Sequence, residues 1–134
     1  MTSIYLAHPY AEREYGIKIQ KLLEDSGYSV CNPFDRPEQE SYDQAVIDQR
    51  PFTYDECEEL VEWDLKHIMD SDCVVVLVVG SGPFIGISME ISYATIHNGL
   101  DVFCLYLTDG IIHPWIKYLT TVVHTEEELL KAIE

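Results

Sequence analysis

The chain has 134 residues, of which 47% are hydrophobic, and its 24 acidic and eight basic residues give a formal net charge of −16. This length suits one domain around one core, so we expect residues 1–134 to form a single domain. A surface so acidic repels nucleic acids and anionic membranes, which excludes both as expected partners. It also disfavours a phosphorylated ligand, unless arginines offset the field locally. A need for solubility, or a high internal salt concentration, would explain the same charge.

Targeting and redox signals point to the cytoplasm. The longest purely apolar stretch, residues 73–79, is far too short to cross a bilayer. The N-terminus lacks the basic and apolar regions of a signal peptide. The four cysteines have no paired metal-binding spacing and are expected to be reduced thiols: Cys31, Cys57, Cys73 and Cys104. We therefore expect a cytoplasmic protein with no metal and no other cofactor.

Strands and helices alternate in the first half of the chain. The hydrophobic pattern and the turn residues predict strands at 3–7 and 28–31 and helices at 11–26 and 54–70. Residues 33–53 are polar, contain three prolines and show no clear period. Because loops of this length in compact domains are often functional lids, we expect a loop here with at most one helical turn, at 45–47.

The second half continues the alternation. Residues 73–79 form a continuous apolar run, which is typical of a parallel strand covered on both faces. A turn is expected at 80–83. The later elements are predicted as a helix at 86–97, strands at 102–107 and 118–123, and a last helix that opens with a capping box of Thr125 and Glu128.

This order of elements defines the expected fold class. It predicts an α/β protein with a three-layer αβα architecture and a five-stranded parallel sheet in the flavodoxin-like order 2-1-3-4-5. In such folds, ligands bind beyond the carboxyl ends of the strands, near the switch point between the first and third strands. We therefore expect the functional site at that edge of the sheet.

A carboxylate interrupts the apolar face of the helix predicted at 54–70. Asp64 lies four residues after Leu60 and four before Ile68, so it should point inward. The predicted apolar stripe comprises Cys57, Leu60, Val61, Leu65 and Ile68. A buried carboxylate must be paired, solvated in a cleft or protonated. The spacing supports equally a functional acid and an aspartate that caps a neighbouring backbone amide.

Glu90 is the second unusual carboxylate. It falls beside Ile87 and Ile91 on the buried face of the helix predicted at 86–97, close to the N-terminus that favours an ionised carboxylate. A functional acid, a surface glutamate that complements the helix dipole and a partner for a cation all fit this position. Tyr5, on the first strand, is a candidate hydrogen-bond donor to Glu90, although a core tyrosine is the more usual explanation.

Six short segments carry a resemblance. They are residues 4–10 (IYLAHPY), 27–33 (GYSVCNP), 63–64 (WD), 71–76 (SDCVVV), 86–94 (GISMEISYA) and 98–99 (NG). In this order and spacing, which cover most of residues 3–107, they resemble the nucleoside 2-deoxyribosyltransferase family. The resemblance implies that Glu90 attacks the anomeric carbon, that Tyr5 holds Glu90, and that Asp64 contacts the departing base and supplies or accepts its proton. Substrate-binding roles are expected for His8, Asp35, Phe84, Gly86 and His113, although a turn residue is the more usual explanation of His8.

The sequence also departs from the family pattern. Phe84 stands where the family often has an acidic residue that binds the sugar, so an apolar wall replaces a polar contact. The family takes an asparagine from a neighbouring subunit after the fourth strand, whereas residues 112–115 (IHPW) contain none and offer His113 as the candidate substitute. The first strand–helix turn, residues 8–13, has one arginine and one glutamate, which makes a 5′-phosphate on the substrate less expected.

Three functions remain open at this point. The first is an enzyme that transfers 2-deoxyribose from a nucleoside to a free base. The second is an N-glycosidase that transfers the sugar to water, and the third is a non-catalytic module that binds or senses a nucleotide. We also expect a homo-oligomer, because family members share active-site residues between subunits and because Trp115 and Tyr118 offer apolar area that a lone domain has little reason to expose.

Overall fold

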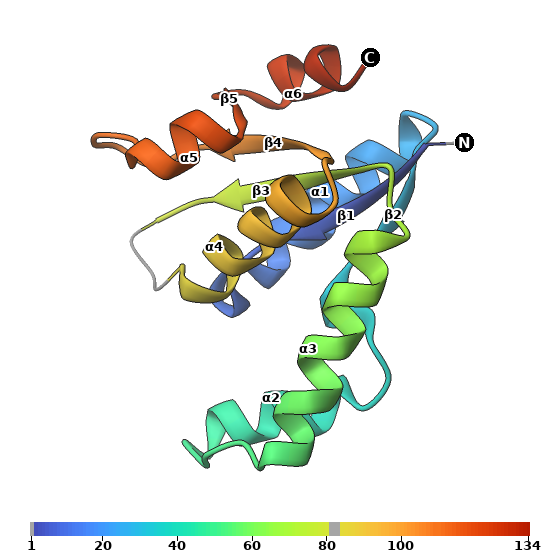
Figure 1. Cartoon of the computed structure of the whole chain (residues 1–134), viewed down its shortest axis with the longest axis vertical. Helices are drawn as coiled ribbons and strands as arrows, with labels where there is room; N and C mark the ends of the chain where they lie inside the picture. Colours follow the sequence, from blue (N-terminus) through green and yellow to red (C-terminus); the bar gives the residue numbers. More distant parts are fainter. Residues whose placement is uncertain (1, 81–83) are drawn as a thin grey trace.

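The structure is a computed structural model that describes residues 2–80 and 84–134, so most of the turn expected at 80–83 lies outside the described residues. Its centre is a five-stranded sheet in the order β2-β1-β3-β4-β5, with every neighbouring pair parallel (Figure 1). The strands are β1 (Ser3–Ala7), β2 (Ser29–Cys31), β3 (Cys73–Val78), β4 (Asp101–Tyr106) and β5 (Thr121–Val123). The expected fold class and strand order are confirmed.

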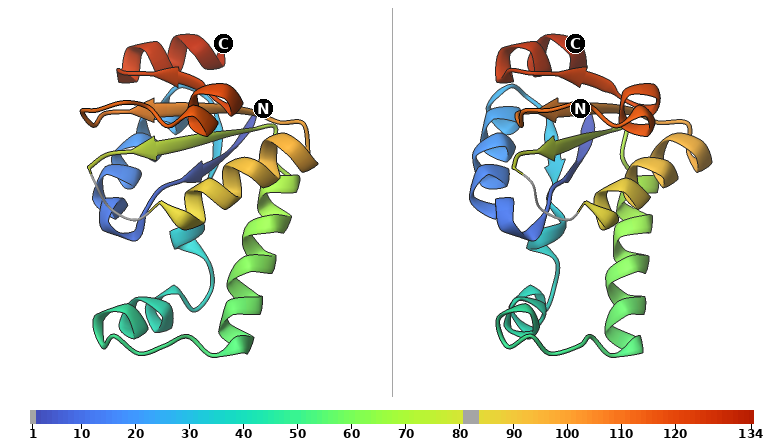
Figure 2. Two further views of the ribbon diagram at one scale, coloured as in Figure 1. Left: turned by 60° about the vertical axis from the view of Figure 1, so that its left-hand side comes forward. Right: turned by 90° about the vertical axis from the view of Figure 1, so that its left-hand side faces the viewer.

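Helices lie on both faces of this sheet (Figure 2). They are α1 (Arg13–Asp25), α2 (Gln39–Ile47), α3 (Tyr54–Met69), α4 (Ile85–Ser92), α5 (Pro114–Leu119) and α6 (Glu126–Ile133). α1 and α6 pack on one face, whereas α4, α5 and the carboxyl end of α3 pack on the other. None of the helices in the described part of the chain has the length and apolar character that a membrane span requires.

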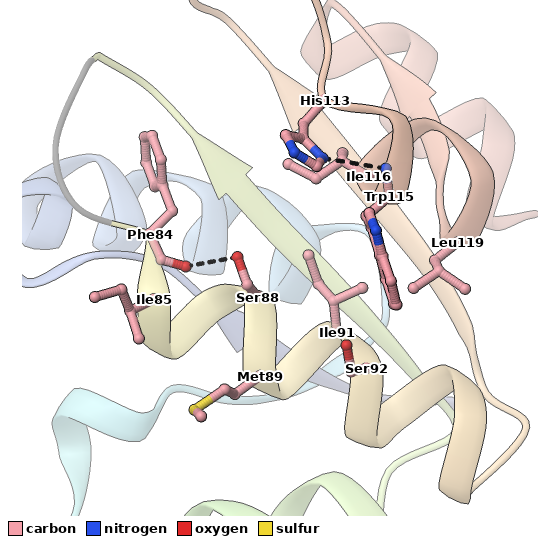
Figure 3. Close-up of a pocket in the computed structure, with 10 residues that line it drawn as sticks. All are labelled: Phe84, Ile85, Ser88, Met89, Ile91, Ser92, His113, Trp115, Ile116 and Leu119. Carbon is pink, nitrogen blue, oxygen red and sulfur yellow. Dashed lines mark hydrogen bonds between the residues drawn. The ribbon is translucent and has the colours of Figure 1, made fainter.

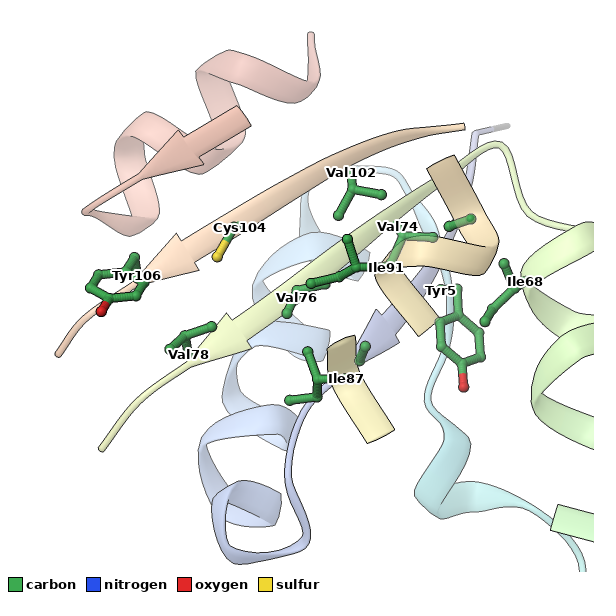
Figure 4. Packing of buried hydrophobic residues seen from close by; sticks show 12 residues of the cluster. Tyr5, Ile68, Val74, Val76, Val78, Ile87, Ile91, Val102, Cys104 and Tyr106 are labelled. Atoms are coloured by element: carbon green, nitrogen blue, oxygen red, sulfur yellow. The ribbon is translucent and has the colours of Figure 1, made fainter. Parts of the chain in front are cut away.

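Alternation along the strands assigns each side chain to one of these two layers. In β1, Ile4 and Leu6 pack with the α1 layer, whereas Tyr5 and Ala7 pack with the α4 layer. Figure 4 shows Tyr5 at the edge of the α4-side cluster, with its hydroxyl pointing away from the packed side chains. The same alternation that builds the core therefore directs one phenol toward α4.

The segment 33–53 is more regular than expected, because α2 occupies nine of its residues. α2 and the N-terminal half of α3 form an arm that projects away from the sheet (Figures 1 and 2). This placement corrects the predicted stripe of α3: Ile68 is fully buried, but Cys57 and Val61 are exposed. Only the carboxyl end of α3 reaches the sheet, so the apolar side chains nearer its N-terminus have no core to pack against.

The predicted strand at 118–123 is wrong in its first half. Pro114 opens α5, where the side chain of His113 accepts a hydrogen bond from the backbone N–H of Trp115 (3.2 Å), and β5 begins only at Thr121. A proline is well suited to the first turn of a helix, which outweighs the local alternation. The last helix begins as expected, with the Thr125 hydroxyl accepting from the N–H of Glu128 (3.0 Å).

Candidate functional site

Tyr5 and Glu90 form the first contact of the site. The Tyr5 hydroxyl donates a hydrogen bond to Oε2 of Glu90 at 2.5 Å. Burial, reinforced by the charges of Glu90 and Asp64, raises the pKa of the tyrosine, so it remains a hydrogen-bond donor. Burial and the negative charge of Asp64 raise the pKa of Glu90 to about 7, although the hydrogen bond from Tyr5 and the charge of Arg36 oppose that shift. Glu90 is thus a carboxylate held by a neutral donor and poised to ionise near neutral pH.

Asp64 is paired with a cation rather than with a backbone amide. Its Oδ1 lies 2.5 Å from Nη2 of Arg36, and the two side chains are only 24% and 9% exposed. The Nη1 atom of Arg36 donates to Oε1 of Gln39 at 3.3 Å, and its guanidinium lies 5.3 Å from the ring centre of Trp63. Burial raises the pKa of Asp64, while the guanidinium acts in the opposite direction. The segment between β2 and α2 therefore supplies the counter-charge for the inward-facing carboxylate.

Arg36, Asp64 and Glu90 line one cavity of about 530 Å³. Its wall is made of His8, Pro9, Tyr10, Ala11, Glu12, Pro33, Phe34, Arg36, Leu60, Asp64, Val79, Gly86, Ile87 and Glu90. Because His8 follows β1 and Val79 follows β3, the cavity lies at the carboxyl ends of these two strands, where the sheet order switches. We call it the carboxyl-edge cavity. The site is thus built at the edge of the sheet that the predicted topology favoured.

His8 forms part of the cavity wall as a buried side chain. Its ring stacks on Phe34 at 4.6 Å between centres, and its two ring nitrogens lie 3.0 Å from the carbonyl oxygen of Pro9 and 3.3 Å from Oδ1 of Asn32. A Cβ at Gly16 would lie 2.5 Å from the His8 ring, so α1 needs a glycine at this point. Burial lowers the pKa of His8, which favours the neutral ring. The stacked ring of His8 thus holds Phe34 against the cavity.

The expected site residues do not all meet in this cavity. Asp64, Glu90, His8 and Gly86 line it, and Tyr5 reaches it through Glu90. Phe84 and His113 line a second hollow of about 550 Å³ between α4 and α5 (Figure 3). Asp35 is exposed, and the cavity wall does not include it.

Arg36 is the main site residue that the sequence analysis did not identify. It lies in the polar segment after β2, where no hydrophobic period draws attention to any one position. A usable signal was the inward-facing Asp64 itself, since a buried carboxylate needs a positive partner. Residues 33–53 contain two arginines, and the structure pairs Arg36 with Asp64 and Arg50 with Glu56.

The fold and the cavity together define a class: a flavodoxin-like α/β protein with two partly buried carboxylates at its switch point. No family model and no curated protein sequence matches the chain. Solved structures do match in fold. A 2-deoxyribosyltransferase from Bacillus psychrosaccharolyticus is 19% identical, with a TM-score of 0.78 over 96% of this chain and 90% of that one.

Two further structures share the architecture. A CMP N-glycosidase from Clostridium botulinum is 19% identical, with a TM-score of 0.61 over 98% of both chains. A conserved protein from Enterococcus faecalis is 18% identical, with a TM-score of 0.71 over 99% of this chain and 97% of that one. The chain therefore has the fold of the family that its short segments resemble.

Proposed function

We propose that this protein is an enzyme that cleaves the N-glycosidic bond of a nucleoside and transfers the sugar to a free base, with Glu90 as the nucleophile. One observation carries the proposal: Glu90 lies in the carboxyl-edge cavity, held by the Tyr5 hydroxyl at 2.5 Å, with a pKa raised to about 7. A glutamate that only complemented a helix dipole would need neither a buried donor nor a cavity. The fold shared with a 2-deoxyribosyltransferase supports the same chemistry.

The proposed reaction has two steps with the retaining stereochemistry of a double displacement. In the first, a Glu90 carboxylate oxygen bonds to the anomeric carbon while the bond from that carbon to the base nitrogen breaks, and its electron pair leaves with the base. Asp64, on the cavity wall contributed by α3, contacts the departing base and exchanges its proton. In the second step, the nitrogen of a new base attacks the anomeric carbon and releases Glu90. A sugar without a 2-hydroxyl eases both steps, because no electron-withdrawing group opposes the developing positive charge.

Hydrolysis is the second candidate function. The match to a CMP N-glycosidase over 98% of both chains favours it, since the two proteins have similar lengths and the same fold. In this case water takes the place of the new base in the second step. The negatively charged cavity wall, with Glu12, Asp64 and Glu90 against one arginine, supports a nucleoside over a nucleotide for either reaction.

We also propose that the protein is a cytoplasmic homo-oligomer. All four cysteines, each within the described residues, are free thiols, which suits a reducing compartment. On the outer side of α4 and α5, Met89, Trp115 and Tyr118 are 70%, 63% and 88% exposed. Together with the exposed Ile85 and Ile96, they form what we call the α4–α5 surface. Exposed apolar side chains gathered in this way are typical of a subunit interface.

The test is to incubate the purified protein with a panel of 2′-deoxynucleosides, with and without a second free base, and to separate the products by chromatography. We expect release of the first base, a new nucleoside when a second base is present, and a mass increase of one deoxyribosyl group on the peptide that contains Glu90. Glu90→Gln should remain folded and lose activity by on the order of 10⁴-fold or more.

Glu127→Gln is the matched control. Glu127 is an exposed glutamate in the first turn of α6, so its loss removes a dipole-complementing charge without touching the cavity. If Glu90→Gln keeps its activity as this control should, Glu90 is not the nucleophile. If the wild-type protein binds a nucleoside or nucleotide yet releases no base, the enzyme hypothesis fails in favour of a binding module.

A further inference from the structure

We propose that Arg36 binds the departing base and stabilises its developing negative charge, so that the preferred substrates are nucleosides whose base carries a carbonyl oxygen beside the glycosidic nitrogen, as pyrimidines do. This inference rests on the proposed function, because it concerns the leaving group of that reaction. It adds a catalytic group that the sequence pattern did not identify, and it gives a physical reason for preferring pyrimidine nucleosides, the class to which the substrate named for the matched CMP N-glycosidase belongs.

The first support is that Arg36 is held in one position at the cavity wall. Its guanidinium lies 5.3 Å from the ring centre of Trp63 and 6.0 Å from that of Phe34. Asp64 and Gln39 accept hydrogen bonds from its two terminal nitrogens at 2.5 and 3.3 Å. A planar guanidinium fixed on several sides loses little conformational freedom when a ligand arrives.

The second support is an unused donor. The Nε atom of Arg36 is buried and has no hydrogen-bond partner among residues 2–80 and 84–134. A buried N–H without an acceptor is unfavourable, and charged donors are the costliest of all to leave unpaired. Since the Arg36 side chain is only 9% exposed and borders the cavity, a ligand oxygen is well placed to complete its hydrogen bonding.

The third support is the charge balance of the cavity. Arg36 is the one lysine or arginine among the described residues of the cavity wall. Glu12, Asp64 and Glu90 are the acidic members of the same wall. An anion that forms on a departing base therefore has one cation to approach, and that cation already stands beside Asp64, the residue expected to face the base.

The chemistry makes an oxygen next to the glycosidic nitrogen the natural partner. As Glu90 bonds to the anomeric carbon, the electron pair of the breaking bond passes to the base nitrogen and is delocalised onto the neighbouring carbonyl oxygen. A hydrogen bond from a guanidinium to that oxygen strengthens as the charge grows, so it lowers the barrier rather than only binding the substrate. The base then takes up a proton, from Asp64 or from water, and leaves as the neutral free base.

A leaving-group series tests this proposal. Base release would be measured for 2′-deoxyuridine and 5-fluoro-2′-deoxyuridine, since fluorine stabilises the leaving anion without any help from the protein. Arg36→Gln should slow release from 2′-deoxyuridine by on the order of 10²–10³-fold, the effect of removing one such donor, and release from the fluorinated substrate by clearly less. Arg36→Lys keeps the charge but not the planar set of donors, so it should fall between wild type and Arg36→Gln.

Arg50→Gln is the matched control, because Arg50 lies in the same segment, 33–53, and pairs with Glu56 at 2.8 Å outside the cavity. It should leave both rates unchanged. If Arg36→Gln slows both substrates by the same factor, Arg36 has only a structural role and the inference is overturned. If the wild type releases neither base, the proposed function itself fails. If Arg36→Gln does not fold, the double variant Arg36→Gln/Asp64→Asn takes its place, because it leaves no unpaired charge. Its two rates are compared with those of Asp64→Asn, and equal slowing of both substrates again overturns the inference.

Discussion

The two sides of helix α4 invert the usual distribution of polar and apolar side chains. On its inner side, Glu90 enters a cavity in which the ionisable groups are enclosed and interlinked with Tyr5, Asp64 and Arg36. On its outer side, Ile85 and Met89 are exposed, and they line one hollow together with apolar side chains of α5. Charge is tolerated inside because Glu90 is paired with Tyr5 and Asp64 with Arg36. Apolar area on the outside calls for a partner of another kind.

The charge distribution sharpens this contrast. Three hollows indent the α4–α5 surface, and among the described residues that line them none is acidic and none is lysine or arginine. The whole chain, by comparison, carries a net charge of −16. Two copies of so acidic a protein can approach with least repulsion through an uncharged face. One short helix therefore connects the proposed chemistry on one side with the proposed assembly on the other.

The largest expected effect is a loss of activity when a carboxylate on the cavity side of this comparison is removed. Asp64→Asn should slow base release by on the order of 10²–10⁴-fold, because it removes the group that we propose exchanges a proton with the departing base. Single-turnover kinetics at several pH values would measure the effect. Asp70→Asn, at the exposed end of the same helix, serves as the control and should have no effect. If Asp64→Asn releases the base as fast as the Asp70→Asn control does, Asp64 takes no part in the reaction.

A charge on the outer side should break the assembly. Met89→Glu places a carboxylate in the α4–α5 surface, and in a two-fold interface it does so twice. We expect the dissociation constant of the oligomer to rise by on the order of 10²-fold or more, since an unpaired charge is costly to bury. Light scattering over a concentration series would show the lower mass. Ile47→Glu, at an exposed apolar position on the arm, should leave the mass unchanged; a wild-type monomer at micromolar concentration would contradict the proposal.

Burial of Glu90 should cost stability at high pH. Its pKa is raised from an ordinary value of 4.5 to about 7 in the folded protein, so the fold disfavours the ionised form. The destabilisation is absent below pH 4.5 and complete above about pH 7, because the folded state holds the proton more tightly than the unfolded state. Glu90→Gln cannot ionise and should be more stable than wild type at pH 8 by on the order of 1–3 kcal/mol. Urea unfolding at pH 8 and at pH 4 would show whether the difference vanishes in acid.

The smallest expected effect concerns the phenol that links the core to the cavity. Tyr5→Phe removes the hydrogen bond that lowers the pKa of Glu90, so this pKa should rise further above about 7. Because attack needs the ionised carboxylate, activity should increase with pH through that value, and the variant should need a higher pH to reach its plateau. We expect about a ten-fold loss at pH 7 and a smaller loss at pH 9. A pH–rate profile that is lowered but not displaced would show that Tyr5 does not control the ionisation of Glu90.

The local patterns of the sequence were sufficient for the strand order of the sheet and for the inward direction of both carboxylates. The apolar run at 73–79 and the alternation of strands and helices predicted the parallel order 2-1-3-4-5, which the structure confirms. Helical spacing indicated that Asp64 and Glu90 face inward, and both line the carboxyl-edge cavity. These features could be predicted because strand and helix periods are short-range properties, and because right-handed crossovers leave few ways to connect them.

Tertiary structure decided the contacts between segments that are distant in sequence. Arg36 and Asp64 lie 28 residues apart, and nothing in the pattern of either segment selects this pair over Arg50. The exposure of Val61 likewise follows from where α3 leaves the sheet, and not from its period. Phe84 and His113 line a hollow beside α5, a helix whose proline outweighed the local alternation. The hydrophobic period of a helix or strand predicts which face of that element a side chain occupies. The residue that the side chain contacts depends on which other element packs against that face.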